Sequence, residues 1–146
     1  MKISVIAIFY NSSAYIKKCI QSILDQQDVF IELIAVDDCS TDDTLKLLQE
    51  YAIIDDRIKI IKHQKNRGIA AARNSGIKAA SGDCFYLIDG DDYLPNNALS
   101  SLAKHFSPEV DWVQGGYEIR NEKNLKIADH IYKYGKYTTH QEIENH

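Results

Sequence analysis

Features that would point to export, membranes or nucleic acid are missing from this 146-residue sequence. No apolar run approaches the roughly 20 residues that a membrane-spanning helix needs. The first residues, Met1 to Val5, enter a strand-like run without the basic and apolar regions of a signal peptide. Lysine and arginine are spread along a chain of net charge -4, which disfavours a nucleic-acid partner. We therefore expect a soluble, cytoplasmic protein that does not bind nucleic acid.

Cysteine is scarce as well. The three cysteines, Cys19, Cys39 and Cys84, are odd in number and show no C-x-x-C spacing. The sequence therefore favours neither a disulfide framework nor a zinc site. Low-complexity tracts are also absent, and 45% of the residues are hydrophobic, which is enough to bury one core. We expect a single domain.

What the sequence does contain is an alternation of strand-like and helix-like segments. Continuous apolar runs rich in β-branched residues predict buried strands, and apolar residues at i, i+3, i+4 spacing predict helices. The predicted strands are Ile3–Phe9, Ile31–Val36, Arg57–Lys62, Cys84–Ile88 and Val110–Ile119, the last interrupted by Gly115-Gly116. The predicted helices are Tyr15–Leu24 capped by Asn11 to Ser13, Ser40–Tyr51, Ile69–Ala80, and a helix opened by Pro95 to Asn97 and reaching Phe106.

This order predicts an α/β fold with a mostly parallel central sheet and helices on both faces. The residues after 120 do not continue the pattern. Leu125–Tyr137 predicts a hairpin that turns at Gly135, and Thr139-x-x-Glu142 is a capping box for a helix with no room before His146. We therefore expect a chain truncated on its C-terminal side.

Polar groups follow three of the predicted strands at the point where each ends. They are Tyr10-Asn11, Asp37-Asp38 and the acidic turn Asp89 to Asp92. In a parallel α/β sheet, ligands bind at the carboxyl ends of the strands. The topology therefore predicts that these groups converge on one site.

The acidic turn places the carboxylates of Asp89 and Asp91 on either side of Gly90, which lets the backbone approach a ligand closely. Mg²⁺ and Mn²⁺ take oxygen ligands and leave positions for substrate phosphates, so a metal–diphosphate site is chemically sensible. The alternative is a solvated turn that caps the helix beginning at Pro95.

Asp38 offers two interpretations. A carboxylate at a strand end can accept the imide N–H of a uracil-type base. Alternatively it belongs to an acid-rich helix N-terminus, in which Ser40-x-x-Asp43 resembles a capping box. Tyr10 supplies either a flat face for a base or ordinary packing.

Arg73 also has two interpretations, as a surface residue or as a guanidinium directed at a phosphate or at the acidic turn. His63 and His105 show no spacing that would suggest metal ligation.

Taken together, these residues resemble the family 2 glycosyltransferases of the GT-A fold. Four blocks carry the resemblance in the family's order and spacing: Ile3 to Asn11, Val36 to Thr44, Asn66 to Asn74 and Tyr86 to Pro95. The resemblance implies an inverting transferase that moves a sugar from a nucleotide-diphospho-sugar, often a UDP-sugar, to a saccharide or lipid-linked acceptor. It implies polysaccharide or glycolipid synthesis in the cytoplasm, at the inner face of the membrane.

The resemblance also implies roles for single residues. Donor binding falls to Tyr10, Asn11, Asp38, Arg73 and Asp89, with Tyr10 at the base, Asp38 on the uracil imide and Arg73 near the diphosphate. Asp91, together with Asp89, is implied to bind Mn²⁺ or Mg²⁺. Residues 1–120 would form the donor-binding core, and residues 121–146 would begin the acceptor side.

The sequence departs from the family at two positions, with Ile8 where proline is common and Cys39 where glycine is frequent. The general base is not identified: in this family it comes from a later acidic motif, and no pattern singles out Glu118, Glu122 or Asp129. A non-catalytic nucleotide-sugar-binding fragment is therefore the alternative. A nucleotide-sugar pyrophosphorylase fits less well, because Tyr10 to Ser13 lacks the glycine-rich basic loop that it would need.

Overall fold

The computed structural model describes residues 1–107, 109–121 and 123–130. The chain divides into two compact units, Met1–Ala98 and Leu99–His146. The expected boundary at residue 120, between the donor-binding core and the acceptor side, concerns function and stays a prediction. Within the described residues, no helix is long and apolar enough to cross a membrane.

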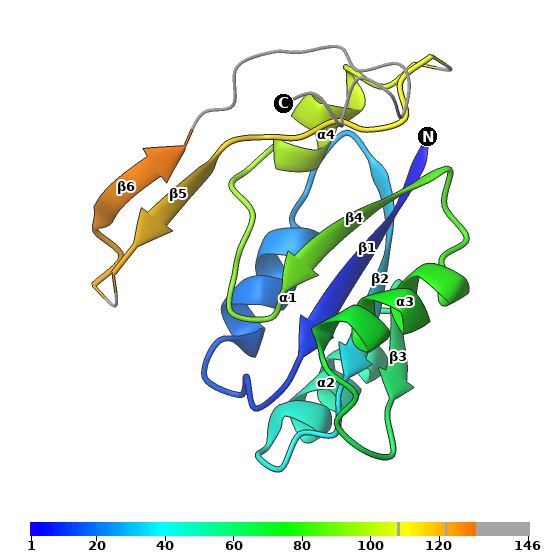
Figure 1. The fold of residues 1–146 in the computed structure, drawn as a ribbon, viewed down its shortest axis with the longest axis vertical. Coiled ribbons are helices and arrows are strands. Elements are labelled where there is room, and N and C mark those ends of the chain that lie inside the picture. Colours follow the sequence, from blue (N-terminus) through cyan, green and yellow to red (C-terminus); the bar gives the residue numbers. More distant parts are fainter. Residues whose placement is uncertain (108, 122, 131–146) are drawn as a thin grey trace. The chain divides into compact units, whose positions relative to one another are not determined.

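The first unit is built on a four-stranded parallel sheet with the strand order β3-β2-β1-β4 (Figure 1). Its strands are β1 (Lys2–Phe9), β2 (Phe30–Asp37), β3 (Ile58–Lys62) and β4 (Cys84–Asp89). Its complete helices are α1 (Ile16–Leu24), α2 (Thr44–Ile54) and α3 (Ile69–Ala79). Figure 1 shows α1 and α2 on one face of the sheet and α3 on the other. The predicted α/β architecture is confirmed.

The central strands β1 and β2 are buried on both faces, as their uninterrupted apolar runs require. On the α3 side, Ile6 and Val36 belong to an apolar cluster that also contains Ala72 of the helix. A Cβ atom at Gly76 would collide with Ile6, so this glycine lets α3 pack closely on the sheet. The chain passes from β1 to β2 and β3 in one direction and reaches β4 on the other side of β1. A ligand crevice is expected at such a reversal.

The start of α2 differs from the prediction. The helix begins at Thr44 and not at Ser40, and its N-cap residue Asp43 makes no side-chain cap hydrogen bond. The Ser40 hydroxyl instead accepts from the main-chain N–H of Asn11 at 3.0 Å, and Asp42 Oδ1 accepts from Thr44 N at 3.0 Å. The capping box predicted from Ser40 and Asp43 is therefore wrong, because a distant loop uses the serine.

The cap predicted for α1 is also wrong. Its N-cap is Tyr15, without a side-chain hydrogen bond. Asn11 and Ser12 turn to the start of α2 instead: Asn11 Oδ1 accepts from Thr41 N at 2.8 Å, and Ser12 N donates to Thr44 Oγ1 at 2.8 Å. The β1–α1 loop thereby fastens to the β2–α2 loop.

The second unit shows two further departures. The helix α4 (Ala98–Ala103) begins three residues after Pro95 and ends before Phe106. Within the predicted strand at 110–119, only the end forms a strand, β5 (Tyr117–Arg120), which pairs antiparallel with β6 (Lys126–His130). Between these two strands, Asn121 N donates to Leu125 O at 3.0 Å. Gly135, Thr139 and Glu142, on which the predicted tail depended, lie outside the described residues.

A buried glutamate holds together the end of the sheet opposite the crevice. Glu32 of β2 is 3% exposed and accepts from Ser4 Oγ at 2.6 Å, Lys59 Nζ at 2.8 Å and Ser81 N at 2.7 Å. Burial alone would raise its pKa, but these hydrogen bonds and one from Lys2 hold the pKa of Glu32 far below its ordinary value of 4.5.

We expect Glu32→Gln to lower the free energy of unfolding by roughly 2 kcal/mol at pH 7, since hydrogen bonds to a charged group contribute about 1.5–3 kcal/mol. A depressed pKa stabilises the fold above the unfolded-state value and loses that effect as pH falls towards the folded value. The difference between wild type and variant should therefore shrink below about pH 4.5. Urea unfolding followed by circular dichroism at pH 3 to 7 measures it. A difference that does not change with pH would contradict the assignment.

Candidate functional site

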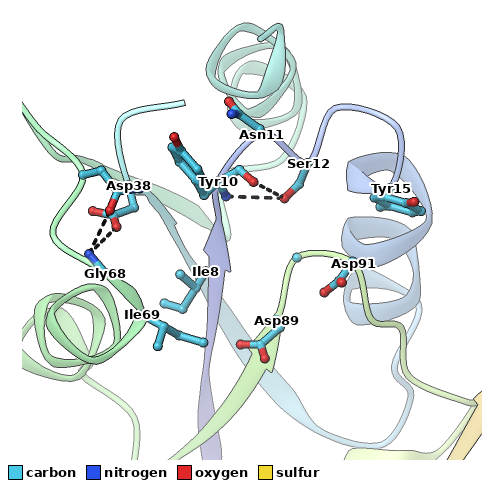
Figure 2. Close-up of a pocket in the computed structure, with 12 residues that line it drawn as sticks. Ile8, Tyr10, Asn11, Ser12, Tyr15, Asp38, Gly68, Ile69, Asp89 and Asp91 are labelled. Carbon is cyan, nitrogen blue, oxygen red and sulfur yellow. Dashed lines mark hydrogen bonds between the residues drawn. The ribbon is translucent and has the colours of Figure 1, made fainter. Parts of the chain in front are cut away.

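A pocket of about 430 Å³ opens at the carboxyl ends of β1, β2 and β4 (Figure 2). It is lined by Ile8, Tyr10, Asn11, Ser12, Tyr15, Asp38, Asn66, Gly68, Ile69, Asp89, Gly90 and Asp91. Figure 2 shows Tyr10 and Asp38 on one side and Asp91 and Tyr15 on the other. The predicted convergence of polar groups at the strand ends is therefore what the structure contains.

The acidic turn reaches the pocket directly from β4. Asp89 is the last residue of the strand, and Gly90 N donates to the carbonyl oxygen of Ile8 at 2.8 Å. A Cβ atom at Gly90 would lie 2.8 Å from that oxygen and would also strike the ring of Phe9. The glycine is thus needed for packing against β1, which the sequence did not reveal. Asp91, beyond it, is exposed at the pocket wall.

The loop after the acidic turn is anchored to α1. Ser22 Oγ accepts from Leu94 N at 3.0 Å, and Gln26 Nε2 donates to Pro95 O at 2.9 Å. The ammonium of Lys18 lies 3.4 Å from the centroid of the Tyr93 ring. The helix α4 has no acidic residue in its first turn.

Arg73 of α3 is directed at the acidic turn. Its Nη2 donates to Asp89 Oδ1 at 2.9 Å, and the two side chains are 36% and 39% exposed. Its Nε is buried and has no hydrogen-bond partner among the residues that the structure describes. Arg73 does not itself line the pocket, but it sets the position of Asp89, which does.

Negative charge accumulates at this end of the pocket. Burial and the neighbouring carboxylates of Asp91 and Asp89 raise the pKa of Asp92. Burial and the same acidic turn raise the pKa of the Cys19 thiol to about 12, so this cysteine stays protonated and unreactive. A cation at the turn would relieve the repulsion between its carboxylates.

Asp38 anchors the opposite wall. Its side chain is 3% exposed, and its carboxylate accepts from His63 Nδ1 at 2.6 Å, Arg67 N at 2.9 Å and Gly68 N at 2.8 Å. Burial alone would raise the pKa of Asp38, but these donors hold it below its ordinary value. The carboxylate is therefore ionised at neutral pH and orders the loop between β3 and α3.

His63 is a residue whose importance the sequence did not predict. It is 6% exposed, and its Nε2 lies 2.9 Å from Ser75 Oγ on α3. It follows β3 at the same edge as the other strand-end groups, and that position was the available signal. Tyr15 was also missed as a pocket residue, although its side chain is 55% exposed there.

Tyr10 and Asn11, which follow β1, both line the pocket. Tyr10 is 49% exposed at the pocket, so a face of its ring is accessible to a ligand. Asn11 has a φ of 51°, and its side chain bonds to Thr41 across the neighbouring loop. Asn11 therefore shapes the pocket wall as well as lining it.

The sequence matches a family of known proteins over nearly its whole length. Residues 4–145 match the description "Glycosyl transferase family 2". This chain belongs to that family. It is 35% identical over 131 residues to glycosyltransferase GlyA of Streptococcus pneumoniae, covering 89% of this chain and 19% of GlyA. It is 37% identical over 101 residues to chondroitin synthase of Escherichia coli, covering 69% of this chain and 15% of the synthase.

A solved structure supports the same fold. The chain resembles S. aureus TarS 1-349 in complex with UDP-GlcNAc, with a TM-score of 0.66 and 34% identity, covering 71% of this chain and 30% of TarS. The GT-A fold expected for this family 2 chain is confirmed. The chain spans well under half the length of each of these three proteins.

Cys39 has a φ of 65° in the structure, a left-handed conformation that favours glycine. A left-handed conformation costs an L-residue about 1–2 kcal/mol, and glycine forfeits roughly 0.5–1 kcal/mol in flexibility. We expect Cys39→Gly to raise the free energy of unfolding by up to about 1 kcal/mol in urea titrations. Cys39→Ala, which keeps the Cβ atom, is the control and should show no gain. An equal gain in both variants would assign the effect to the thiol and not to the backbone.

Proposed function

We propose that this family 2 chain binds a nucleotide-diphospho-sugar, a UDP-sugar, as the donor-binding part of an inverting, metal-dependent glycosyltransferase. The observation that carries the proposal is that one pocket is lined by Tyr10 and Asp38 as well as by Asp89 and Asp91. A nucleotide-diphospho-sugar has a flat base at one end and a charged diphosphate at the other, which matches the two sides of this pocket.

The base belongs beside Asp38. A uracil stacked on the exposed ring of Tyr10 would present its imide N–H to the ionised carboxylate. The S. aureus TarS structure in complex with UDP-GlcNAc, which shares 34% identity with this chain, supports a uridine nucleotide.

The diphosphate belongs between Arg73 and the acidic turn. The guanidinium already pairs with Asp89, and its buried Nε is a donor that still lacks an acceptor. The Nε is buried and out of a ligand's reach, so a phosphate oxygen at the turn would accept from the exposed part of the guanidinium, whose geometry suits phosphate. Arg73 would then both orient Asp89 and hold the diphosphate.

The residues of the acidic turn suit a hard divalent cation, Mn²⁺ or Mg²⁺. No group of three or more metal-ligating side chains occurs within the described ranges, so the protein itself would supply the two carboxylates of Asp89 and Asp91. Mg²⁺ is commonly held in this way, by one or two carboxylates with the remaining positions filled by substrate phosphates and water. When bound, the cation would stabilise negative charge on the departing diphosphate.

No described residue is assigned as the general base. Glu118 pairs with Arg120 at 2.6 Å and Asp129 with Lys126 at 2.6 Å, and these cations lower the pKa of each carboxyl. Both are therefore weak bases, and Glu122 lies outside the described residues. Inversion with the help of a general base outside the described residues is proposed from the family alone. The alternative, a fragment that binds the donor without transferring the sugar, uses the same pocket.

The acceptor and the setting are proposed on the same basis. The similarity to chondroitin synthase, whose name denotes a polysaccharide product, supports a saccharide acceptor. A lipid-linked acceptor is proposed from the family alone. We place the reaction in polysaccharide or glycolipid synthesis at the cytoplasmic face of the membrane, in peripheral association with it.

Calorimetry of the 146-residue chain with UDP, with and without Mn²⁺, tests the donor site. We expect Mn²⁺ to tighten UDP binding about tenfold, which corresponds to about 1.4 kcal/mol. Asp91→Asn should abolish that gain, because it removes one of the two carboxylates proposed to hold the cation. The control Asp56→Asn removes an exposed carboxylate outside the pocket and should behave as wild type. Absence of metal-dependent UDP binding in the wild type would refute the proposed metal–diphosphate site.

A further inference from the structure

The hydrogen bonds of Asp38 restrict what a ligand can offer it. An ionised carboxylate accepts at about four lone-pair positions, two on each oxygen. Oδ1 accepts from His63 Nδ1 at 2.6 Å and from Arg67 N at 2.9 Å, so both of its positions are in use. Oδ2 accepts from Gly68 N at 2.8 Å and shares the Arg67 N–H only at 3.1 Å. The Arg67 N–H is a single donor shared between the two oxygens, so three N–H groups meet about four acceptor positions. The position that remains for a ligand is the one on Oδ2, where Arg67 N is the more distant donor.

His63 is the side chain that occupies an acceptor position on Asp38 Oδ1. Since the carboxylate cannot donate, the short contact requires that His63 Nδ1 carry the proton. Its other nitrogen is held by Ser75 Oγ at 2.9 Å, and the ring is 6% exposed, so it cannot turn away readily. The donors of Arg67 and Gly68 are main-chain groups and are present whatever their side chains are.

Nucleobases differ in how many donors they present to a carboxylate. Uracil offers a single imide N–H. Guanine offers N1–H and the N2 amine side by side, a pair that needs one acceptor position on each carboxylate oxygen. A buried donor without an acceptor costs about 1–3 kcal/mol, so a site with one open position discriminates against the second donor.

We infer that His63 is a specificity-determining positioning residue, which occupies Oδ1 of Asp38 and so restricts the pocket to bases with one imide-type donor. The inference rests on the proposed donor site and deepens it, because it selects uridine over guanosine nucleotides. His63 itself touches no ligand and acts through Asp38.

Inosine diphosphate separates this effect from base size. It has the N1–H of guanine but not the N2 amine, so the affinity ratio of GDP to IDP reports whether a second acceptor is available. For the 146-residue chain, calorimetry should show that GDP binds no more tightly than IDP. In His63→Ala, which frees a position on Oδ1, GDP should bind at least about fivefold more tightly than IDP, since a second satisfied donor contributes about 1 kcal/mol or more.

His63→Asn is the matched control, because its amide can place an N–H where Nδ1 stands. It should restore the wild-type ratio, which a merely structural role of His63 would not explain. Any other pattern of ratios among the three proteins overturns the inference. If circular dichroism shows that His63→Ala does not fold, the affinity ratio of GDP to IDP in the wild type decides. A ratio near one supports the inference, and a ratio of about five or more refutes it.

A second ligand pair separates this result from the proposed function. UDP methylated at N3 lacks the imide N–H, and we expect it to bind the wild type at least about tenfold more weakly than UDP. Equal binding of the two would refute the Asp38–base contact, and the inference with it. A preserved N3 effect together with tight, amine-dependent GDP binding would refute only the role of His63.

Discussion

The pocket depends on one buried charge, the carboxylate of Asp38 at the end of β2. A charge with 3% of its side chain exposed is tolerable only when donors satisfy it, and those donors come from the loop between β3 and α3. His63 extends the contact to Ser75 on the helix. The need to satisfy Asp38 therefore positions a strand end, a loop and a helix around the same cavity.

The remaining walls are held by the same kind of interaction. Asp42 accepts from Ser13 N and Thr44 N, and Asn11 accepts from Thr41 N, so the loops after β1 and β2 support one another. These polar groups are satisfied within the protein and are structural. Asp91, in contrast, is exposed at the pocket wall, where a ligand can reach it. The hydrogen bonds that each carboxylate accepts therefore separate the structural acidic residues from those available to a ligand.

The two ends of the pocket favour different ligand groups. At the acidic turn, Asp89, Asp91 and Asp92 repel one another, and Arg73 is the cation that balances Asp89. At the other end, donors already saturate most of Asp38. A ligand with a cation and diphosphate at one end and a single N–H at the other complements both, which is why we favour a UDP-sugar.

The four strands of the parallel sheet, the order of the helices between them and the convergence of polar strand ends could be predicted from the sequence, because buried parallel strands require continuous apolar runs and topology brings their ends together. Only the tertiary structure decided where α2 begins, why Gly90 is needed and what His63 does. Each depends on a partner from another element: Asn11 takes the Ser40 hydroxyl, Phe9 leaves no room beside Gly90, and Asp38 binds His63. Local patterns record how a segment folds, but contacts between distant segments form only once the chain has packed.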